Sequence, residues 1–396
     1  MENTSSHSRR ILQFALVIGL SAFVQAGEVR YAAPKDLPVS CVLVSDTDLV
    51  HSTQLTARGT GDLPSQTREV TAALQALLSQ AGSGWGNIVK INVYAASDED
   101  AVSVASILDG QFELHCKPSV ACVSTPLRHP GSRVAMDVIA TVPKSADRSN
   151  TLSAGFLRSG PRVYISGQAE KGDGTVADAT RKTMESLGRT LDFLQIEKSN
   201  VVQVKCFLNP MSSVSDAERE IAAWFSSPKN QNTGDAAGAS PGCPTAFVEW
   251  QSTLPVEIEM VVSAPGLGTG PSLEVRTPPG MTTPAVYSRL TIVRHPTSIY
   301  IGGLYPALPT ASPSIQLRSL FSRLKQCLDV TGSDWMHLVK ATYYVSDDAL
   351  SKEHNVVRPD YFSPRRPPAA SKANVRGVGL PGHGISMDFI VVPGEP

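Results

Sequence analysis

The stretch VYISGQ at residues 163–168 is a short apolar strand that ends in a glycine turn, and the elements around it decide the fold. A helical stretch follows it, and then comes a second apolar strand, VVQVKCFL, at residues 201–208. A second helix ends at Trp224-Phe225, and the strand VEIEMVV at 256–262 closes the unit. The whole unit spans about 110 residues, which is the size of a small domain rather than of a solenoid repeat.

Two further copies of this unit flank the clearest one. The third copy has its strands at 299–303, 338–345 and 386–392, and the first has them at 49–54, 88–94 and 135–140. Each copy also has a helix whose apolar residues recur in steps of three and four, so that they share one helix face. These faces consist of Val70, Leu74, Leu77 and Ala81; of Met184, Leu187, Leu191 and Leu194; and of Leu317, Phe321, Leu324 and Leu328.

The order of strands and helices predicts the fold class. Each copy reads strand, strand, helix, strand, helix, strand, strand, which predicts an α+β domain with two helices on one face of a mixed sheet. The other face of each sheet also carries apolar residues and needs a cover. Three sheets that pack together around a pseudothreefold axis would cover one another, so we expect a monomer that forms an intramolecular pseudotrimer.

The domain limits follow from composition. We expect domains at residues 40–142, 151–265 and 285–393. The glycines and prolines of residues 266–284 predict a linker between the second and third copies.

Residues 1–26 predict a signal peptide. Arg9-Arg10 precede an apolar stretch that runs from Ile11 to Val24, and small residues follow it. A membrane anchor is the alternative, but the stretch is shorter than a spanning helix needs. We therefore expect an exported protein, periplasmic or secreted, with no stable membrane insertion after cleavage.

The composition is that of an ordinary globular protein: 396 residues, 41% hydrophobic, 18% charged, with a formal net charge of -1. A near-neutral chain without a basic run lacks the charge pattern of a nucleic-acid binder. No cysteine or histidine spacing resembles a zinc site, and no phosphate loop occurs, so we expect no metal and no cofactor. An oxidising compartment would permit disulfides, for which Cys116 and Cys122 are the nearest pair. Cys206 and Cys327 occupy apolar positions that suit buried free thiols.

The repeated motifs resemble the Rid family, also called the YjgF or L-PSP endoribonuclease-like family. The family pattern is a strand ending in Ser-Gly-Gln, a helix, a Val-Val-Lys strand, an aromatic pair, a Pro-Ala-Arg-Ser segment and a Glu-Ile-Glu strand. The resemblance covers nearly all of the chain after the signal peptide, although the first copy matches weakly. The matching motifs are Ser166-Gly167-Gln168, Trp224-Phe225, Val248-Glu249-Trp250 and Glu257-Ile258-Glu259 in the second copy, and Val339-Lys340, Tyr361-Phe362 and Leu380-Pro381 in the third.

The resemblance implies clefts between neighbouring domains, and the hydrolysis of reactive imines and enamines to keto acids and ammonia. In the family, the arginine of the Pro-Ala-Arg-Ser segment grips the substrate carboxylate. This position holds Val120, Thr245 and Lys372 in the three copies, so the arginine is absent from all of them. Lys372 keeps the positive charge but lacks the planar fork that binds a carboxylate at two points.

The third copy keeps most of the implied site. The resemblance places Tyr287, Asn355 and Lys372 in the cleft as substrate-binding residues, and Gly303 at a turn whose backbone faces the substrate. The water-activating glutamate survives only as Glu257 of the second copy, so we expect one composite site between these two copies. Each residue also has a purely structural interpretation: Lys372 and Glu257 as exposed strand residues, Tyr287 as packing, Asn355 as a helix cap and Gly303 as a turn.

Three hypotheses for the function follow. The first is an exported protein that binds a small carboxylate or imine metabolite in an interdomain cleft, with residual hydrolytic deaminase activity. The second is a non-catalytic binding or scaffold protein whose clefts have decayed. The third, endoribonuclease activity, follows only from the old family name, and the charge balance opposes it.

Overall fold

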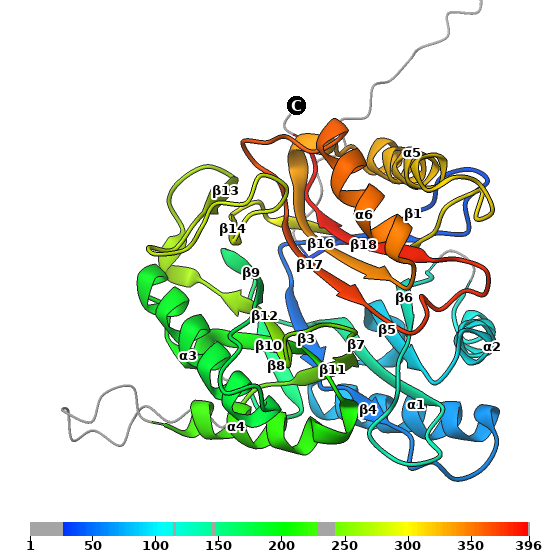
Figure 1. The fold of residues 1–396 in the computed structure, drawn as a ribbon, viewed down its shortest axis with the longest axis horizontal. Helices are drawn as coiled ribbons and strands as arrows, with labels where there is room; N and C mark the ends of the chain where they lie inside the picture. Colours follow the sequence, from blue (N-terminus) through cyan, green and yellow to red (C-terminus); the bar gives the residue numbers. More distant parts are fainter. Residues whose placement is uncertain (1–26, 114–115, 145–147, 228–241, 395–396) are drawn as a thin grey trace, which may run out of the picture.

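The computed structural model describes residues 27–113, 116–144, 148–227 and 242–394. The predicted signal peptide at 1–26 lies outside these residues, so export stays a prediction. The described residues form a mixed α+β architecture with three six-stranded sheets and six α-helices. Figure 1 shows the helices at the periphery and the strands in the middle. No helix of the described part is long and apolar enough to cross a membrane.

The first sheet has the order β6-β5-β7-β3-β8, and β4 pairs with β7. Helices α1 (Leu63–Gln80) and α2 (Asp98–Asp109) belong to this part of the chain. The N-cap residue Asp62 starts α1, because its side chain accepts a hydrogen bond from the Ser65 amide. The strands are β3 (Asp48–Ser52), β4 (Leu55–Thr56), β5 (Ile88–Ala95), β6 (Ser119–Ser124), β7 (Val134–Val142) and β8 (Ala154–Leu157).

The second sheet has the order β11-β10-β12-β9-β14-β13, with helices α3 (Val176–Leu194) and α4 (Val214–Ser226). Met184, Leu187, Leu191 and Leu194 are all buried against it, as the apolar spacing predicts. The strands are β9 (Arg162–Gln168), β10 (Val201–Leu208), β11 (Thr245–Glu249), β12 (Val256–Ser263), β13 (Leu273–Arg276) and β14 (Leu290–Val293).

The third sheet has the order β1-β2-β15-β18-β16-β17. Its helices are α5 (Pro313–Thr331) and α6 (Asp348–Val357), and the short helix η6 (Arg358–Asp360) continues from α6. The predicted apolar faces of α1 and α5 are buried too, with one exception. In α1 the predicted Leu77 is only partly buried, and its neighbour Leu78 is fully buried instead. The strands are β1 (Val29–Ala32), β2 (Cys41–Ser45), β15 (Thr297–Leu304), β16 (Leu338–Val345), β17 (Ala369–Asn374) and β18 (Ile385–Val391).

The sheets do not follow the predicted domain limits, because each takes edge strands from another part of the sequence. Strand β8 pairs with β3, β14 pairs with β9, and β2 pairs with β15. The opening strand of every copy therefore completes a neighbouring sheet instead of its own. The limits 40–142, 151–265 and 285–393 stay a prediction about the sequence repeats, and each sheet is built across them. Apolar alternation decides which face a strand buries, and does not decide which strand it pairs with.

The predicted linker at 266–284 also differs from expectation. Strand β13 lies inside it and pairs with β14, so part of this glycine- and proline-rich stretch belongs to a sheet. The six cysteines all lie in the described part and are free, so Cys116 and Cys122 form no disulfide. Cys206 and Cys327 are buried, as their apolar positions predict.

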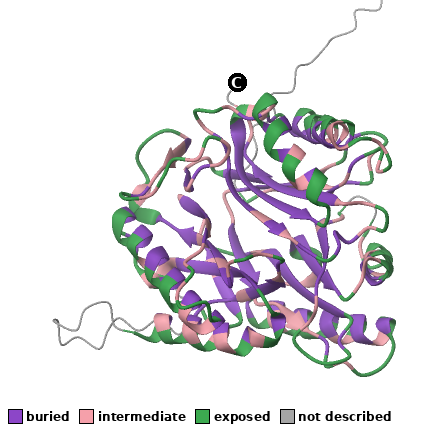
Figure 2. Cartoon of the chain, viewed as in Figure 1, coloured by how far each residue is buried: buried purple, intermediate pink, exposed green. Residues whose placement is uncertain are grey.

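The sheet faces turned away from the helices contact one another. Figure 2 shows the strands almost entirely buried, whereas exposed residues lie mainly on the helices and loops. One apolar cluster between the sheets takes residues from all three, including Val44 and Ile390, Val89 and Ile139, and Val202. Burial of this second face gives each sheet a core on both sides, which accounts for the apolar residues that the helices do not cover.

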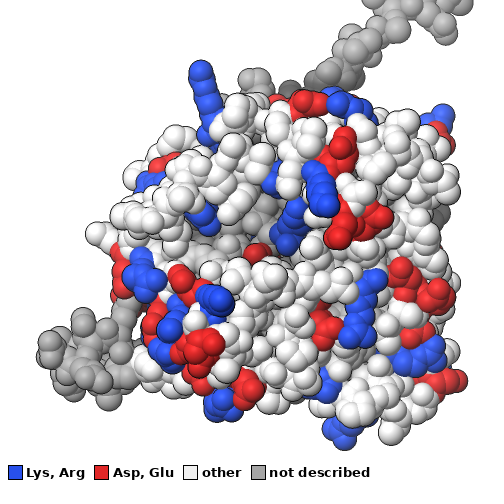
Figure 3. Space-filling view, viewed as in Figure 1, with Lys and Arg blue, Asp and Glu red and all other residues white. Residues whose placement is uncertain are grey.

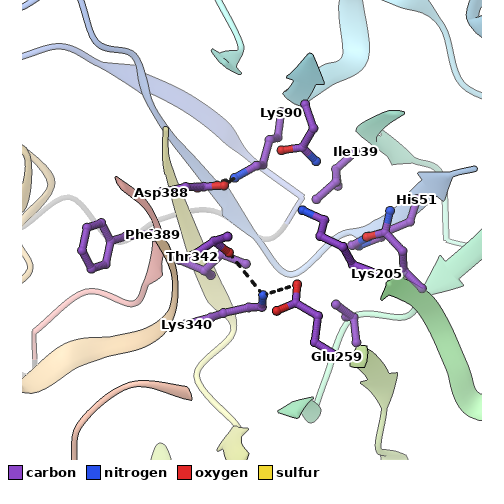
Figure 4. A pocket seen from close by; sticks show the side chains of 13 residues that line it. His51, Lys90, Ile139, Lys205, Glu259, Lys340, Thr342, Asp388 and Phe389 are labelled. Atoms are coloured by element: carbon purple, nitrogen blue, oxygen red, sulfur yellow. Dashed lines mark hydrogen bonds and ion pairs between the residues drawn. The ribbon is translucent and has the colours of Figure 1, made fainter. Parts of the chain in front are cut away.

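A polar chamber of about 40 Å³ lies where the sheets meet, and Figure 4 shows its lining. Lys90 on β5 and Lys340 on β16 occupy equivalent positions, and the same position on β10 holds Gln203. Lys205 lies two residues further along β10, and all four side chains line the chamber. The Lys90 ammonium pairs with Asp388, and Lys340 Nζ lies 2.6 Å from Glu259 Oε1. Both ion pairs join two different sheets.

Lys205 differs from the other two lysines of the chamber. Its ammonium points into the chamber, and no carboxylate of the described residues lies within ion-pair distance of it. Asp137, the counterpart of Asp388 and Glu259, accepts hydrogen bonds from Asn92 Nδ2 at 2.8 Å, from the Tyr94 hydroxyl at 2.5 Å, and at 3.4 Å from Nε2 of Gln203, which stands where the other two copies have their paired lysines. Burial alone would lower the pKa of Lys205, but Tyr344, Glu259 and Asp137 together raise it above its ordinary value, so the ammonium stays charged.

Candidate functional site

Three contacts between the copies have a common plan. In each, the strand that holds the family's arginine position lies against the end of the second strand of another copy, which is β15, β3 or β9. We name them by their residues: the Gly303 contact (β15 with β6), the Gln54 contact (the end of β3 with β11) and the Lys372 contact (β9 with β17). They differ in what fills them, and this difference locates the candidate site.

The Gly303 contact is closed by backbone. Gly303 has a φ of 65°, and a Cβ atom added to it would lie 2.6 Å from the Val120 carbonyl oxygen. The position therefore requires glycine both for its conformation and for the close approach of β6. The structure thus places Gly303 against Val120 of β6. At β17, the strand that holds Lys372, the equivalent glycine is Gly167.

The Gln54 contact is closed by a side chain. Gln54 Nε2 donates to the Phe247 carbonyl at 3.0 Å, and the Phe247 amide donates to Gln54 Oε1 at 3.2 Å. The Thr53 hydroxyl donates to the Thr245 carbonyl at 3.1 Å. Glu218, which stands where the third copy has Asn355, forms an ion pair with Arg128. The polar groups of this contact therefore satisfy one another.

The Lys372 contact brings Glu257 to Gly167 and Ser371. The Gly167 amide donates to Ser371 Oγ at 3.1 Å, and Ser371 Oγ donates to Glu259 Oε2 at 2.6 Å. A Cβ atom on Gly167 would lie 2.1 Å from Glu257 Oε1, so glycine makes room for this carboxylate. Glu257 is therefore packed against the turn and is not the exposed strand residue of the alternative interpretation.

The surroundings of Glu257 change its proton affinity. Burial, and secondly the charge of Glu259, raise its pKa to about 7, although a hydrogen bond from Ser371 and the charge of Lys340 act in the opposite direction. A carboxyl group with this pKa is close to half-protonated at neutral pH. Such a group can accept and return a proton, as general acid–base chemistry requires.

A second group of residues lies on the helix side of the same contact. Lys372 Nζ donates to the Ser351 carbonyl at 3.2 Å and lies 3.5 Å from Asn355 Oδ1. Arg358 Nη2 donates to the same Asn355 Oδ1 at 3.1 Å. Among the described residues, neither cation forms an ion pair with a carboxylate. We call Lys372 and Arg358 the cation pair.

The environment of the cation pair is otherwise neutral. Burial, and secondly Arg358, lower the pKa of Lys372, and burial lowers that of Arg358. His354 is completely buried beneath the pair, with its ring centroid 4.4 Å from that of Tyr343. Burial and the two cations hold the pKa of His354 well below its ordinary value, so its imidazole is neutral. Tyr287 is half-buried, packs on the third core, and lies near Arg358.

The structure thus gathers four of the five candidate residues at one contact, in two groups. Lys372, Asn355 and Tyr287 lie with Arg358, and Glu257 lies at Ser371, the residue before Lys372. Successive side chains of a strand point to opposite faces, so the two groups flank β17 from its two sides. β17 is the outermost strand of its sheet, and β9 of the second copy lies against it. Asn355 accepts hydrogen bonds from side chains and is not an N-cap, since Asp347 caps α6.

The sequence did not indicate Arg358. It lies outside every motif that carries the resemblance, in the turn after α6. Its separation of three residues from Asn355 places both on one side of a helical turn, which is the only signal that could have found it. Among the described residues, no group of three or more His, Cys, Asp or Glu side chains could hold a metal ion.

Comparisons with known proteins agree with the repeated pattern. The family model described as Endoribonuclease L-PSP matches residues 45–142, 145–263 and 281–392. A RutC family protein of Synechocystis is 30% identical over 89 residues, which are 22% of this chain and 68% of the relative.

Solved structures with similarity include a YjgF family protein from Neisseria meningitidis. It is 18% identical, covers 31% of this chain and 100% of its own, and has a TM-score of 0.22. A YjgF family protein from Mycobacterium tuberculosis is 22% identical, covers 26% of this chain and 84% of its own, and has a TM-score of 0.21.

Proposed function

The chain belongs to the Rid (YjgF, L-PSP endoribonuclease-like) family and carries three tandem copies of its domain, and on this premise we propose that it binds a small imine or enamine metabolite with a carboxylate group at the Lys372 contact. Hydrolytic deamination of that ligand is its proposed activity. The three copies act as one intramolecular pseudotrimer, and export through residues 1–26 belongs to the same proposal.

One observation carries the proposal: two cations, Lys372 and Arg358, share the Asn355 oxygen and have no carboxylate partner among the described residues. Buried charges are normally paired, because removing a charge from water is costly. A ligand carboxylate supplies the missing partner. Each charge-assisted hydrogen bond contributes about 1.5–3 kcal/mol to binding.

In the proposed reaction, the ligand lies across the edge of β17, with the cation pair on one side and Glu257 on the other. As a carboxylate, Glu257 accepts a proton from a water molecule while the water oxygen attacks the imine carbon, and it returns this proton to the imine nitrogen. In the resulting carbinolamine, Glu257 takes the hydroxyl proton as the carbonyl forms and gives it to the nitrogen as the C–N bond breaks, which leaves a keto acid and releases ammonia. A pKa of about 7 allows Glu257 to take the proton from water and to give it to the leaving nitrogen.

The three contacts support the pseudotrimer. The first copy meets the second at Gln54, the second meets the third at Gly167, and the third meets the first at Gly303. Contacts of one type that close into a ring are those of a cyclic trimer.

A non-catalytic binding protein is the alternative. The closed Gln54 and Gly303 contacts favour it, since two of three equivalent clefts hold no unpaired charge among the described residues.

Endoribonuclease activity receives less support. On the face that Figure 3 shows, Lys and Arg are interspersed with Asp and Glu instead of forming a basic track for a phosphate backbone.

The test is the hydrolysis of 2-iminobutanoate, generated in place, by the purified protein. We expect acceleration over buffer, and a loss of about 10- to 100-fold in kcat/KM for Lys372→Ala, because one charge-assisted bond is lost. Lys352→Ala, an exposed lysine of α6, is the matched control and should match the wild type. If the wild type does not accelerate the reaction, the hydrolase is excluded for this substrate class. Calorimetry with 2-oxobutanoate then decides whether the binding function remains.

A further inference from the structure

The cation pair contains one more positive charge than a single carboxylate neutralises. The family motif provides one cation at this place, and here it is Lys372. Arg358 comes from outside the motif and adds a second cation at the same oxygen atom. This second positive charge restricts the class of ligand that can neutralise the site.

We propose that Arg358 and Lys372 together form a dianion site, so that the ligand of the Lys372 contact carries two negative charges close together. A dicarboxylate and a phosphate ester share this chemistry. The inference rests on the proposed function for its location and deepens it by naming the charge of the ligand.

The geometry holds both cations within reach of one small ligand. Arg358 Nη2 and Lys372 Nζ lie 3.1 Å and 3.5 Å from Asn355 Oδ1, and this neutral amide oxygen is their common acceptor. An amide oxygen carries no net charge, so it leaves the repulsion between the cations uncompensated. A monoanion leaves one of the two charges unbalanced, whereas a dianion balances both.

Arg358 is built into the protein and is not a loose surface side chain. It is 6% exposed, and its guanidinium lies 5.9 Å from the centre of the Tyr343 ring. Its Nε is buried and has no acceptor in the described residues. A buried donor without an acceptor is uncommon and indicates that a partner is missing.

The nearby acidic residue of the same turn does not neutralise the pair. Asp360 lies two residues after Arg358, but its carboxylate pairs with Arg318 at 2.9 Å. His354 beneath the pair is neutral, for the reasons given above. The ligand is therefore the remaining source of negative charge for Arg358 and Lys372 within the described structure.

The test is isothermal titration calorimetry of the whole chain with succinate, butanoate and inorganic phosphate at low salt. Succinate and butanoate have equal chain length and differ by one carboxylate. We expect the wild type to bind succinate or phosphate at least about tenfold tighter than butanoate, since the dianion gains one further charge-assisted bond. The order of succinate and phosphate tells which kind of dianion the site accepts.

Variants assign the preference to Arg358. Arg358→Met should bind succinate and butanoate alike, Arg358→Lys should keep the preference for the dianion, and Arg219→Met, an exposed arginine of α4, should match the wild type. Equal binding of butanoate and the dianions by the wild type, or an unchanged preference in Arg358→Met, overturns the proposal. The wild-type comparison holds even if Arg358→Met does not fold.

The hydrolysis assay separates the two proposals. Hydrolysis of 2-iminobutanoate without any preference for dianions supports the proposed function and contradicts the dianion site. A preference for dianions without hydrolysis supports the dianion site and leaves only the binding function.

Discussion

The central chamber and the Lys372 contact both bury cations, but they compensate them differently. In the chamber, Lys90 and Lys340 each pair with a carboxylate from another sheet. At the contact, Lys372 and Arg358 share a neutral amide oxygen. The difference separates two roles of a buried charge. A compensated charge joins elements of the fold, whereas an uncompensated charge at an edge strand is available to a ligand.

The largest expected effect comes from breaking a compensated pair. Lys340→Met leaves Glu259 buried without its ammonium partner and should lower the free energy of unfolding by about 3–5 kcal/mol. Urea denaturation followed by circular dichroism measures this change. Lys352→Met, at an exposed position, should stay within about 0.5 kcal/mol of the wild type. A loss of unfolding free energy below about 1 kcal/mol for Lys340→Met would show that the ion pairs of the chamber do not stabilise the fold.

The next effect concerns Glu257, which lies between the two regions. Glu257→Gln removes the group that accepts the proton of water and should lower kcat for imine hydrolysis by about 100-fold or more. The wild-type rate should rise with pH through about 7, where the pKa of Glu257 lies, because the carboxylate is the active form. Glu185→Gln, on the outer side of α3, is the control and should keep the wild-type rate and profile. A pH profile that is unchanged in Glu257→Gln would assign proton transfer to another group.

Glu257 also predicts a dependence of stability on pH. Its pKa is raised from 4.5 to about 7, so the folded protein holds a proton that the unfolded chain has lost between these two values. The contribution of this group is therefore present below pH 4.5 and is lost as the pH rises to 7. The difference in unfolding free energy between Glu257→Gln and the wild type should grow across this window, in favour of the variant.

The smallest effect is expected at Lys205, the unpaired lysine of the chamber. Lys205→Met breaks no direct ion pair of the described residues and should cost about 1 kcal/mol, clearly less than Lys340→Met. Thermal unfolding of both variants side by side measures the difference. Equal losses would mean that Lys205 is compensated through the chamber as fully as Lys340 is.

Much of the fold could be predicted because its signals are local. The apolar face of α3 and the position of the strand 201–208 follow from periodicities of 3.6 and 2 residues. Four candidate site residues meet at one contact, and the resemblance that selected them rests on short motifs. Arg358 could not be selected in this way, since its importance comes from the Asn355 oxygen that it shares with Lys372.

The amino-acid sequence by itself determined three copies of one α+β unit, the helix faces that each buries, and the loss of the family's arginine at Val120, Thr245 and Lys372. These properties depend on residue type and spacing along the chain. Only the tertiary structure decided that opening strands complete neighbouring sheets, that Lys205 lacks an acidic partner, and that Arg358 joins Lys372. Such pairings depend on distances between residues far apart in the chain, which close packing of the whole molecule sets.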